Sequence, residues 1–156
     1  MKNKDFKPNF TIKFIAFAAE ELGLLGSWDY AEKSINAGLK IKMMLNNDMI
    51  AYWPGTNSDE WVVNIIDYPN STTLRQKAQK FCSLYTLLKT NNDNTYYSSS
   101  DSYPFAYYNH SAIFFITNAD DPNYHTPDDL VSACNFEFCR EVVKVNCALL
   151  IENNGI

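Results

Sequence analysis

The sequence predicts a three-layer α/β fold in which helices cover both faces of a mostly parallel or mixed central sheet. Short apolar runs rich in β-branched and aromatic residues alternate with segments whose apolar residues recur at helical spacing. Clusters of polar residues with Gly, Pro or Asn separate these segments and mark turns. The chain has 156 residues, 46% of them hydrophobic, which predicts one globular domain over residues 1–156.

Four apolar runs are predicted as strands. The first, residues 11–19, holds the β-type residues Ile12, Phe14, Ile15 and Phe17, and we expect it to be buried. The other three predicted strands cover residues 39–45, 61–66 and 112–117.

Four segments are predicted as helices. The first is marked by apolar residues at helical spacing, namely Leu24, Leu25, Trp28, Ala31 and Ile35. Gly38 is placed to end this helix. Residues 72–89 and 135–152 each carry an apolar stripe typical of a longer helix. A short helical segment is expected at residues 102–109.

Composition excludes several classes of function. The net charge is −5 and no basic stripe is present, so nucleic acid is not an expected partner. The apolar runs are too short to cross a bilayer, and the polar residues 1–9 are unlike a signal peptide. The four cysteines lack C-x-x-C spacing and are predicted as small core residues, which leaves the redox compartment open.

Two adjacent carboxylates, Glu20 and Glu21, end the first predicted strand. Neighbouring side chains on a regular strand point to opposite faces, so both acids serve one site only if the chain turns there. Gly23 and Gly26 permit such a turn. The pair then suits a metal site in which one carboxylate binds the ion and the other handles a proton of water. The alternative is an ordinary helix start, with acids near the positive end of the dipole.

Two further polar residues are expected near this pair. Asp48 follows the second predicted strand, and His125 lies in the loop after the fourth. Sites in open α/β sheets form beyond the carboxyl ends of strands, and carboxylate with imidazole suits zinc. Each also has a structural interpretation, because Asp48 could be a turn residue and His125 could precede a helix beginning at Thr126 and Pro127. Because Asp48, His125 and the acid pair are all expected at one edge of the sheet, a metal site is favoured over these structural interpretations.

Four motifs, in order and spacing, resemble those of the M28 zinc aminopeptidases: FAAEELGLLGS at 17–27, NDMI at 47–50, SD at 100–101 and YHTPDD at 124–129. By this resemblance Glu20 is the general base, while Glu21 and His125 bind one zinc and Asp48 binds the other. Tyr97 stands where some relatives carry a tyrosine that polarises the substrate carbonyl, although an aromatic packing role is the simpler interpretation.

The sequence departs from the family pattern in two places. Ser102 follows Asp101 where relatives often have histidine. This alters the surroundings of the metal ligands, to which Asp101 belongs, rather than the ligands themselves, which are Glu21, Asp48 and His125. Complete members also carry an upstream histidine and a bridging aspartate, and the segment that holds them is not found before residue 20. The other histidine, His110, is predicted to be a surface turn residue. The chain is therefore expected to be the C-terminal portion of an M28 domain.

A catalytic zinc normally has three protein ligands, so weak, single-site or absent zinc binding is expected here, against two zinc ions in complete relatives. The resemblance implies a metal-dependent aminopeptidase acting on peptides, impaired or inactive as this isolated chain. The alternatives are a non-catalytic interaction module of the same fold and a glutaminyl cyclase-like zinc acyltransferase. An exposed sheet edge would be covered by a second copy or by a separate N-terminal piece. A full-length form is expected outside the cytoplasm.

Overall fold

The computed structural model describes residues 7–153. In this part of the chain a four-stranded mixed sheet has the order β1-β4-β2-β3. Its strands are β1 (Met44–Asn47), β2 (Val62–Asp67), β3 (Lys89–Asn91) and β4 (Ala112–Thr117). β1 runs parallel to β4, whereas β2 runs antiparallel to β4 and parallel to β3. The predicted mixed sheet is confirmed.

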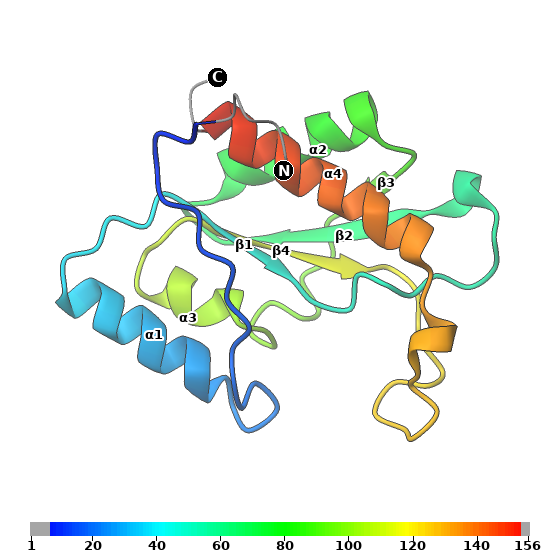
Figure 1. The fold of residues 1–156 in the computed structure, drawn as a ribbon, viewed down its shortest axis with the longest axis horizontal. Coiled ribbons are helices and arrows are strands. Elements are labelled where there is room, and N and C mark those ends of the chain that lie inside the picture. Colours follow the sequence, from blue (N-terminus) through cyan, green and yellow to red (C-terminus); the bar gives the residue numbers. More distant parts are fainter. Residues whose placement is uncertain (1–6, 154–156) are drawn as a thin grey trace.

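Helices cover both faces of this sheet, as the sequence predicts (Figure 1). One face carries α1 (Leu25–Asn36) and α3 (Ser102–Tyr107), and the other carries α2 (Thr72–Tyr85) and α4 (Phe136–Asn153). Two short 3-10 turns, η1 (Ser58–Glu60) and η2 (Val131–Ala133), lie in the connections.

β4 positions the core because all six of its residues are buried. Ile113 and Phe115 pack in one cluster with α2 and α4, while Phe114 and Ile116 pack in another on the opposite face. This alternation is the period of two that a central strand requires. Each face of the sheet therefore has its own apolar layer.

The first predicted strand is wrong. Residues 11–19 form no strand, and Phe14 is 89% exposed. A strand needs a neighbour for its backbone hydrogen bonds, and within residues 7–153 β1 pairs with β4 alone. Residues 11–19 have the composition of a strand, but within residues 7–153 no strand lies beside them to accept and donate backbone hydrogen bonds.

Two boundaries also differ from the sequence prediction. β1 begins at Met44 rather than at residue 39. α2 ends at Tyr85, because Thr86 adopts an extended backbone. Of the residues predicted as its last turn, only Lys89 belongs to a strand, as the first residue of β3. The backbone of Lys89 instead donates to the Trp61 carbonyl at 2.9 Å.

Among the described residues no helix is long and apolar enough to span a membrane. The four cysteines are free, and Cys82 is fully buried whereas the other three are partly buried.

Candidate metal centre

The first wall of the site is a tight turn that leads into α1. The Glu20 carbonyl accepts from the backbone nitrogens of Gly23 at 3.0 Å and Leu24 at 2.8 Å. Ala19, Gly23 and Leu24 all have positive φ angles, of 56°, 102° and 60°. Both Glu20 and Glu21 precede the helix, whose first turn holds no acidic residue. The predicted turn is confirmed, and the two acids lie in it, before the helix, rather than in the first turn of the helix.

The second wall follows β1. Asp48 comes directly after the strand, and its backbone nitrogen donates to the Phe115 carbonyl of β4 at 3.2 Å. The Asp48 carboxylate oxygen Oδ2 accepts from the Ser100 hydroxyl at 2.8 Å. Met49 has a φ of 52°, a left-handed conformation that turns the chain immediately beyond Asp48. The carboxylate therefore lies at the carboxyl end of the parallel pair β1 and β4, as predicted.

The third wall is the loop that carries His125. The histidine has a φ of 58°, and its ring stacks on that of Tyr124 with centroids 3.8 Å apart. His125 Nε2 lies 2.7 Å from Glu21 Oε1. Thr126 closes a local turn by donating to the Asn123 carbonyl at 2.7 Å, and no helix starts at Pro127 in the described chain. The helix-start alternative for this motif is therefore wrong.

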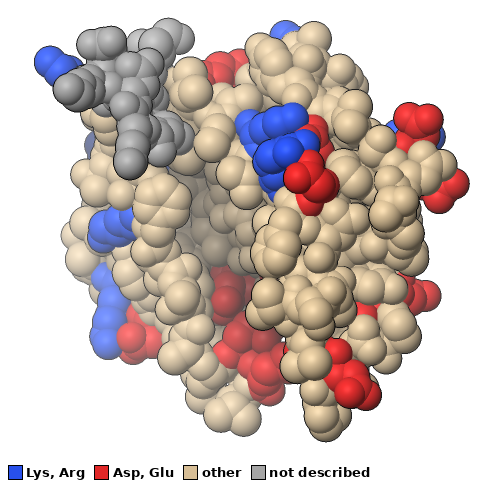
Figure 2. All heavy atoms as spheres, turned by 45° about the vertical axis from the view of Figure 1, so that its right-hand side comes forward, with Lys and Arg blue, Asp and Glu red and all other residues tan. Residues whose placement is uncertain are grey.

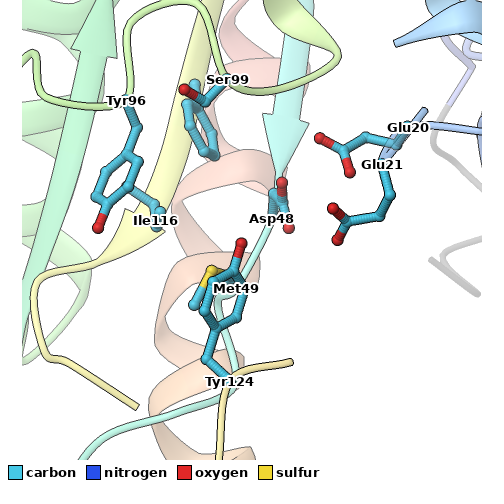
Figure 3. Close-up of a pocket in the computed structure, with 9 residues that line it drawn as sticks. Glu20, Glu21, Asp48, Met49, Tyr96, Ser99, Ile116 and Tyr124 are labelled. Atoms are coloured by element: carbon cyan, nitrogen blue, oxygen red, sulfur yellow. The ribbon is translucent and has the colours of Figure 1, made fainter. Parts of the chain in front are cut away.

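The three walls border a pocket, and each of them contributes residues to its lining. Its acidic residues are Glu20, Glu21 and Asp48, and Figure 3 shows all three side chains directed toward a common space. An adjoining pocket adds His125, Asp121 and Asp129 to Glu21 and Asp48. In the space-filling view, acidic side chains gather at the lower end of a hollow in the surface (Figure 2).

This concentration of acids alters the pKa of its members. Burial raises the pKa of Glu20, and repulsion from Asp48, Glu21 and Asp101 adds to the rise, while His125 opposes it. Burial likewise raises the pKa of Asp101, against a hydrogen bond from Ser27. A site that disfavours accumulated negative charge in this way is suited to a cation.

Aromatic residues line the site differently from the sequence expectation. The pocket wall includes Tyr96 and Tyr124, but not Tyr97. The Tyr97 ring packs against Tyr68, with centroids 4.8 Å apart, and against Tyr103. Tyr124 was not singled out from the sequence, although its place beside His125 in the YHTPDD motif was a signal.

The prediction for His110 is wrong. Its side chain is only 8% exposed, and its Nε2 has no hydrogen-bond partner among the described residues. The preceding Asn109, with a φ of 64°, forms the exposed turn, and His110 tucks beside the Phe105 ring at a centroid distance of 6.4 Å. Burial lowers the pKa of His110. It lies in the core beneath α3 and is absent from both pockets.

The donor types fit zinc, but their number is small. Glu21 and His125 offer one oxygen and one nitrogen, which contact each other directly at 2.7 Å. Two ligands of a tetrahedral zinc lie about 3.3 Å apart, so these two side chains would have to separate to admit the ion. No group of three or more His, Cys, Asp or Glu side chains within residues 7–153 is arranged to hold a metal ion. The described residues thus offer donor types that suit zinc but not a complete set of ligands.

A family model of peptidase family M28 matches residues 1–150 of the chain. The chain belongs to peptidase family M28. Leucine aminopeptidase 1 from Trichophyton equinum is 34% identical over 155 residues, covering 91% of this M28 chain and 39% of that protein. Leucine aminopeptidase 1 from Trichoderma harzianum is 29% identical over 154 residues, covering 93% and 37%.

Solved structures share the fold of this M28 chain. LapB from Legionella pneumophila superposes with a TM-score of 0.83 at 20% identity, covering 97% of this chain and 42% of LapB. BSAP, a zinc aminopeptidase from Bacillus subtilis, gives a TM-score of 0.69 at 23% identity, covering 88% and 34%. The M28 chain therefore spans about two-fifths of the length of the relatives it matches.

Proposed function

We propose that this M28 chain carries the general base and part of the zinc-binding site of a metal-dependent aminopeptidase. The observation that supports this best is the gathering of Glu20, Glu21, Asp48 and His125, from three separate loops, around two adjoining pockets that share Glu21 and Asp48. The proposal is further supported by relatives that are named leucine aminopeptidases.

In this proposal Glu21 and His125 would hold one zinc ion, and Asp48 would bind the other. Bound zinc supplies Lewis-acid activation of water and of the peptide carbonyl. Glu20 takes a proton from the attacking water and delivers it to the departing amine, as a general base that then acts as an acid. Asp101 lies close enough to Glu20 and Asp48 for charge repulsion, so it would influence the ligands without binding metal.

The remaining pocket wall is apolar and suits an apolar substrate side chain. It is formed by Met49, Phe114 and Ile116, with Tyr96 and Tyr124 at its borders. The hydroxyl groups of these tyrosines are better placed to contact a bound peptide than that of Tyr97, whose ring packs on Tyr68. An unblocked peptide with a bulky apolar first residue is the substrate class we propose.

The isolated chain would bind one zinc ion weakly or none, because only two donors converge on one position. We propose that a full working unit includes further M28 residues or a second copy, which would also cover the exposed segment 11–19. From the family resemblance we also propose that such a full-length form works outside the cytoplasm.

Zinc content and aminopeptidase activity of the purified chain test the proposal. Hydrolysis of leucine p-nitroanilide, measured with added Zn²⁺, should fall by about 10²-fold or more in Glu20→Gln while zinc binding persists. Glu32→Gln on the exposed side of α1 is the matched control and should retain activity. Zinc-dependent turnover that survives Glu20→Gln would refute the role of the base. Absence of zinc binding and turnover from the chain alone is expected of an incomplete site, whereas their absence from a form that carries the further M28 residues would favour a non-catalytic module.

A further inference from the structure

A buried hydrogen-bond chain leads from β1 to the Asp48 carboxylate. Asn46 is 8% exposed, and its side-chain nitrogen Nδ2 donates to Ser100 Oγ at 2.6 Å. Ser100 is 1% exposed, and its hydroxyl donates to Asp48 Oδ2 at 2.8 Å. Asn46 and Asp48 are two residues apart along an extended chain, so both side chains lie on the same side.

The chemistry of the three groups fixes the direction of this chain. An amide nitrogen can only donate, and an aspartate carboxylate at neutral pH can only accept. The Ser100 hydroxyl has one proton, so accepting from Asn46 leaves that proton for Asp48. The opposite orientation would place two donors against each other at 2.6 Å.

We propose that Asn46 is a positioning residue for Asp48 that acts through Ser100. By occupying the acceptor side of the Ser100 hydroxyl, it directs the proton onto Oδ2 and holds the carboxylate in one orientation. Oδ1 then remains the oxygen available to a ligand in the pocket. That Asp48 would bind a metal rests on the proposed function, whereas the orientation of its carboxylate does not.

The matched variants are Asn46→Asp and Asn47→Asp. Both add one negative charge next to Asp48, but the Asn47 amide bonds to Leu45 and Asn146 and not to Ser100. Ser100→Ala removes the hydroxyl itself. The double variant Asn46→Asp/Ser100→Ala separates action through Ser100 from direct repulsion between the carboxylates, because only direct repulsion would persist without the hydroxyl.

The first measurement uses the metal-free chain and the carbonyl ¹³C resonance of the Asp48 side chain. We expect Asn46→Asp and Ser100→Ala each to shift this resonance, the double variant to shift it no further than Ser100→Ala, and Asn47→Asp to leave it in place. Additive shifts, or equal shifts from the two Asn→Asp variants, would overturn the proposal. If circular dichroism shows that Asn46→Asp does not fold, Asn46→Leu, which cannot donate, takes its place in the same cycle.

The second measurement is the dissociation constant for Co²⁺, followed by its visible absorption. Asn46→Asp and Ser100→Ala should each weaken binding by about 10–100-fold, and Asn47→Asp by much less. Equal weakening by the two Asn→Asp variants would contradict the proposal here too. If the unaltered chain takes up no Co²⁺, its site is incomplete, as the proposed function allows, and the metal-free resonances alone decide the role of Asn46. The proposed function is tested separately by Glu20→Gln.

Discussion

Replacing Gly26 by alanine tests how closely the turn carrying the acid pair is packed on α1. A Cβ atom at Gly26 would lie 2.6 Å from the Ala18 carbonyl oxygen and 2.9 Å from its nitrogen. Ordinary contact begins at 3.4 Å, so the turn and the helix must separate by about 0.8 Å at that oxygen. Both obstructing atoms belong to the backbone, so no side-chain rotation relieves the clash.

Two opposing terms set the expected size of the effect. Overpacking of this kind costs about 1–3 kcal/mol. Alanine in place of a helical glycine returns roughly 0.5–1 kcal/mol. We therefore expect Gly26→Ala to lower the free energy of unfolding by about 1–2 kcal/mol. Urea denaturation should show this as a midpoint lower by roughly 0.5–1 M.

A second readout locates the damage. The ¹⁵N resonances of the His125 ring should shift in Gly26→Ala, because the displaced turn carries Glu21, which contacts that ring at 2.7 Å. Gly38→Ala is the control, since Gly38 has a φ of 66° but nothing within 4 Å of its Cβ position. Gly38→Ala should cost stability through backbone strain alone and leave His125 unchanged. An unchanged or raised stability of Gly26→Ala would refute the packing argument.

Three further substitutions have defined outcomes. Burial lowers the pKa of His110, so as the pH drops below about 6.5 the unfolded chain takes up this proton before the folded chain does. The free energy of unfolding therefore decreases as the pH is lowered from about 6.5, by at most about 1.4 kcal/mol per pH unit. Urea unfolding at several pH values should show that the free energy of unfolding of His110→Gln changes less with pH than that of the unaltered chain, and an equal change would contradict this. Glu141→Ala should cost about 1–3 kcal/mol in urea unfolding, because the 1% exposed carboxylate accepts from Lys144 at 2.6 Å and from the Leu87 nitrogen, whereas the exposed Glu137→Ala should change little. Phe14→Ser should leave stability unchanged but reduce self-association in sedimentation velocity if a second copy covers residues 11–19, and an unaltered association would place that contact elsewhere.

Local patterns predicted the elements whose environment is uniform. Five of the six residues of β4 are apolar, the last is Thr117, and all six are buried, so its bounds follow from this short run. α4 begins one residue after the predicted start because Asn135 caps it, accepting from the Phe138 nitrogen at 3.0 Å. Such signals lie within a few residues of the element they define.

The errors arose where distant residues decide the outcome. Residues 11–19 have strand composition, but a strand exists only beside another strand. The composition of Leu87 and Leu88 suits a helix or a strand. The helix does not continue through them, because the backbone nitrogen of the neighbouring Lys89 donates to the distant Trp61 carbonyl. His110 is polar and follows a turn, and only the position of α3 shows that it is buried.

The candidate site was predictable in its main members because its signals are short motifs, although only Asp48 directly follows a strand and the acid pair lies in the turn before α1. Asp48 and His125 were placed near the acid pair by the rule for sheet edges, and the structure brings them to adjoining pockets. Which tyrosine faces the pocket depends on the path of a loop. Tyr96 and Tyr97 are adjacent in sequence, and no local pattern distinguishes them.

The left-handed backbone at Ala19, Met49 and His125 has a consequence for ligand binding. Each such residue costs about 1–3 kcal/mol, and the surrounding packing must compensate for this when the chain folds. The three loops are consequently shaped before any ion arrives. A cation would then bind to loops that already have their bound conformation, so little conformational entropy would be lost on binding. The affinity would be governed by the number of donor atoms that face the cation.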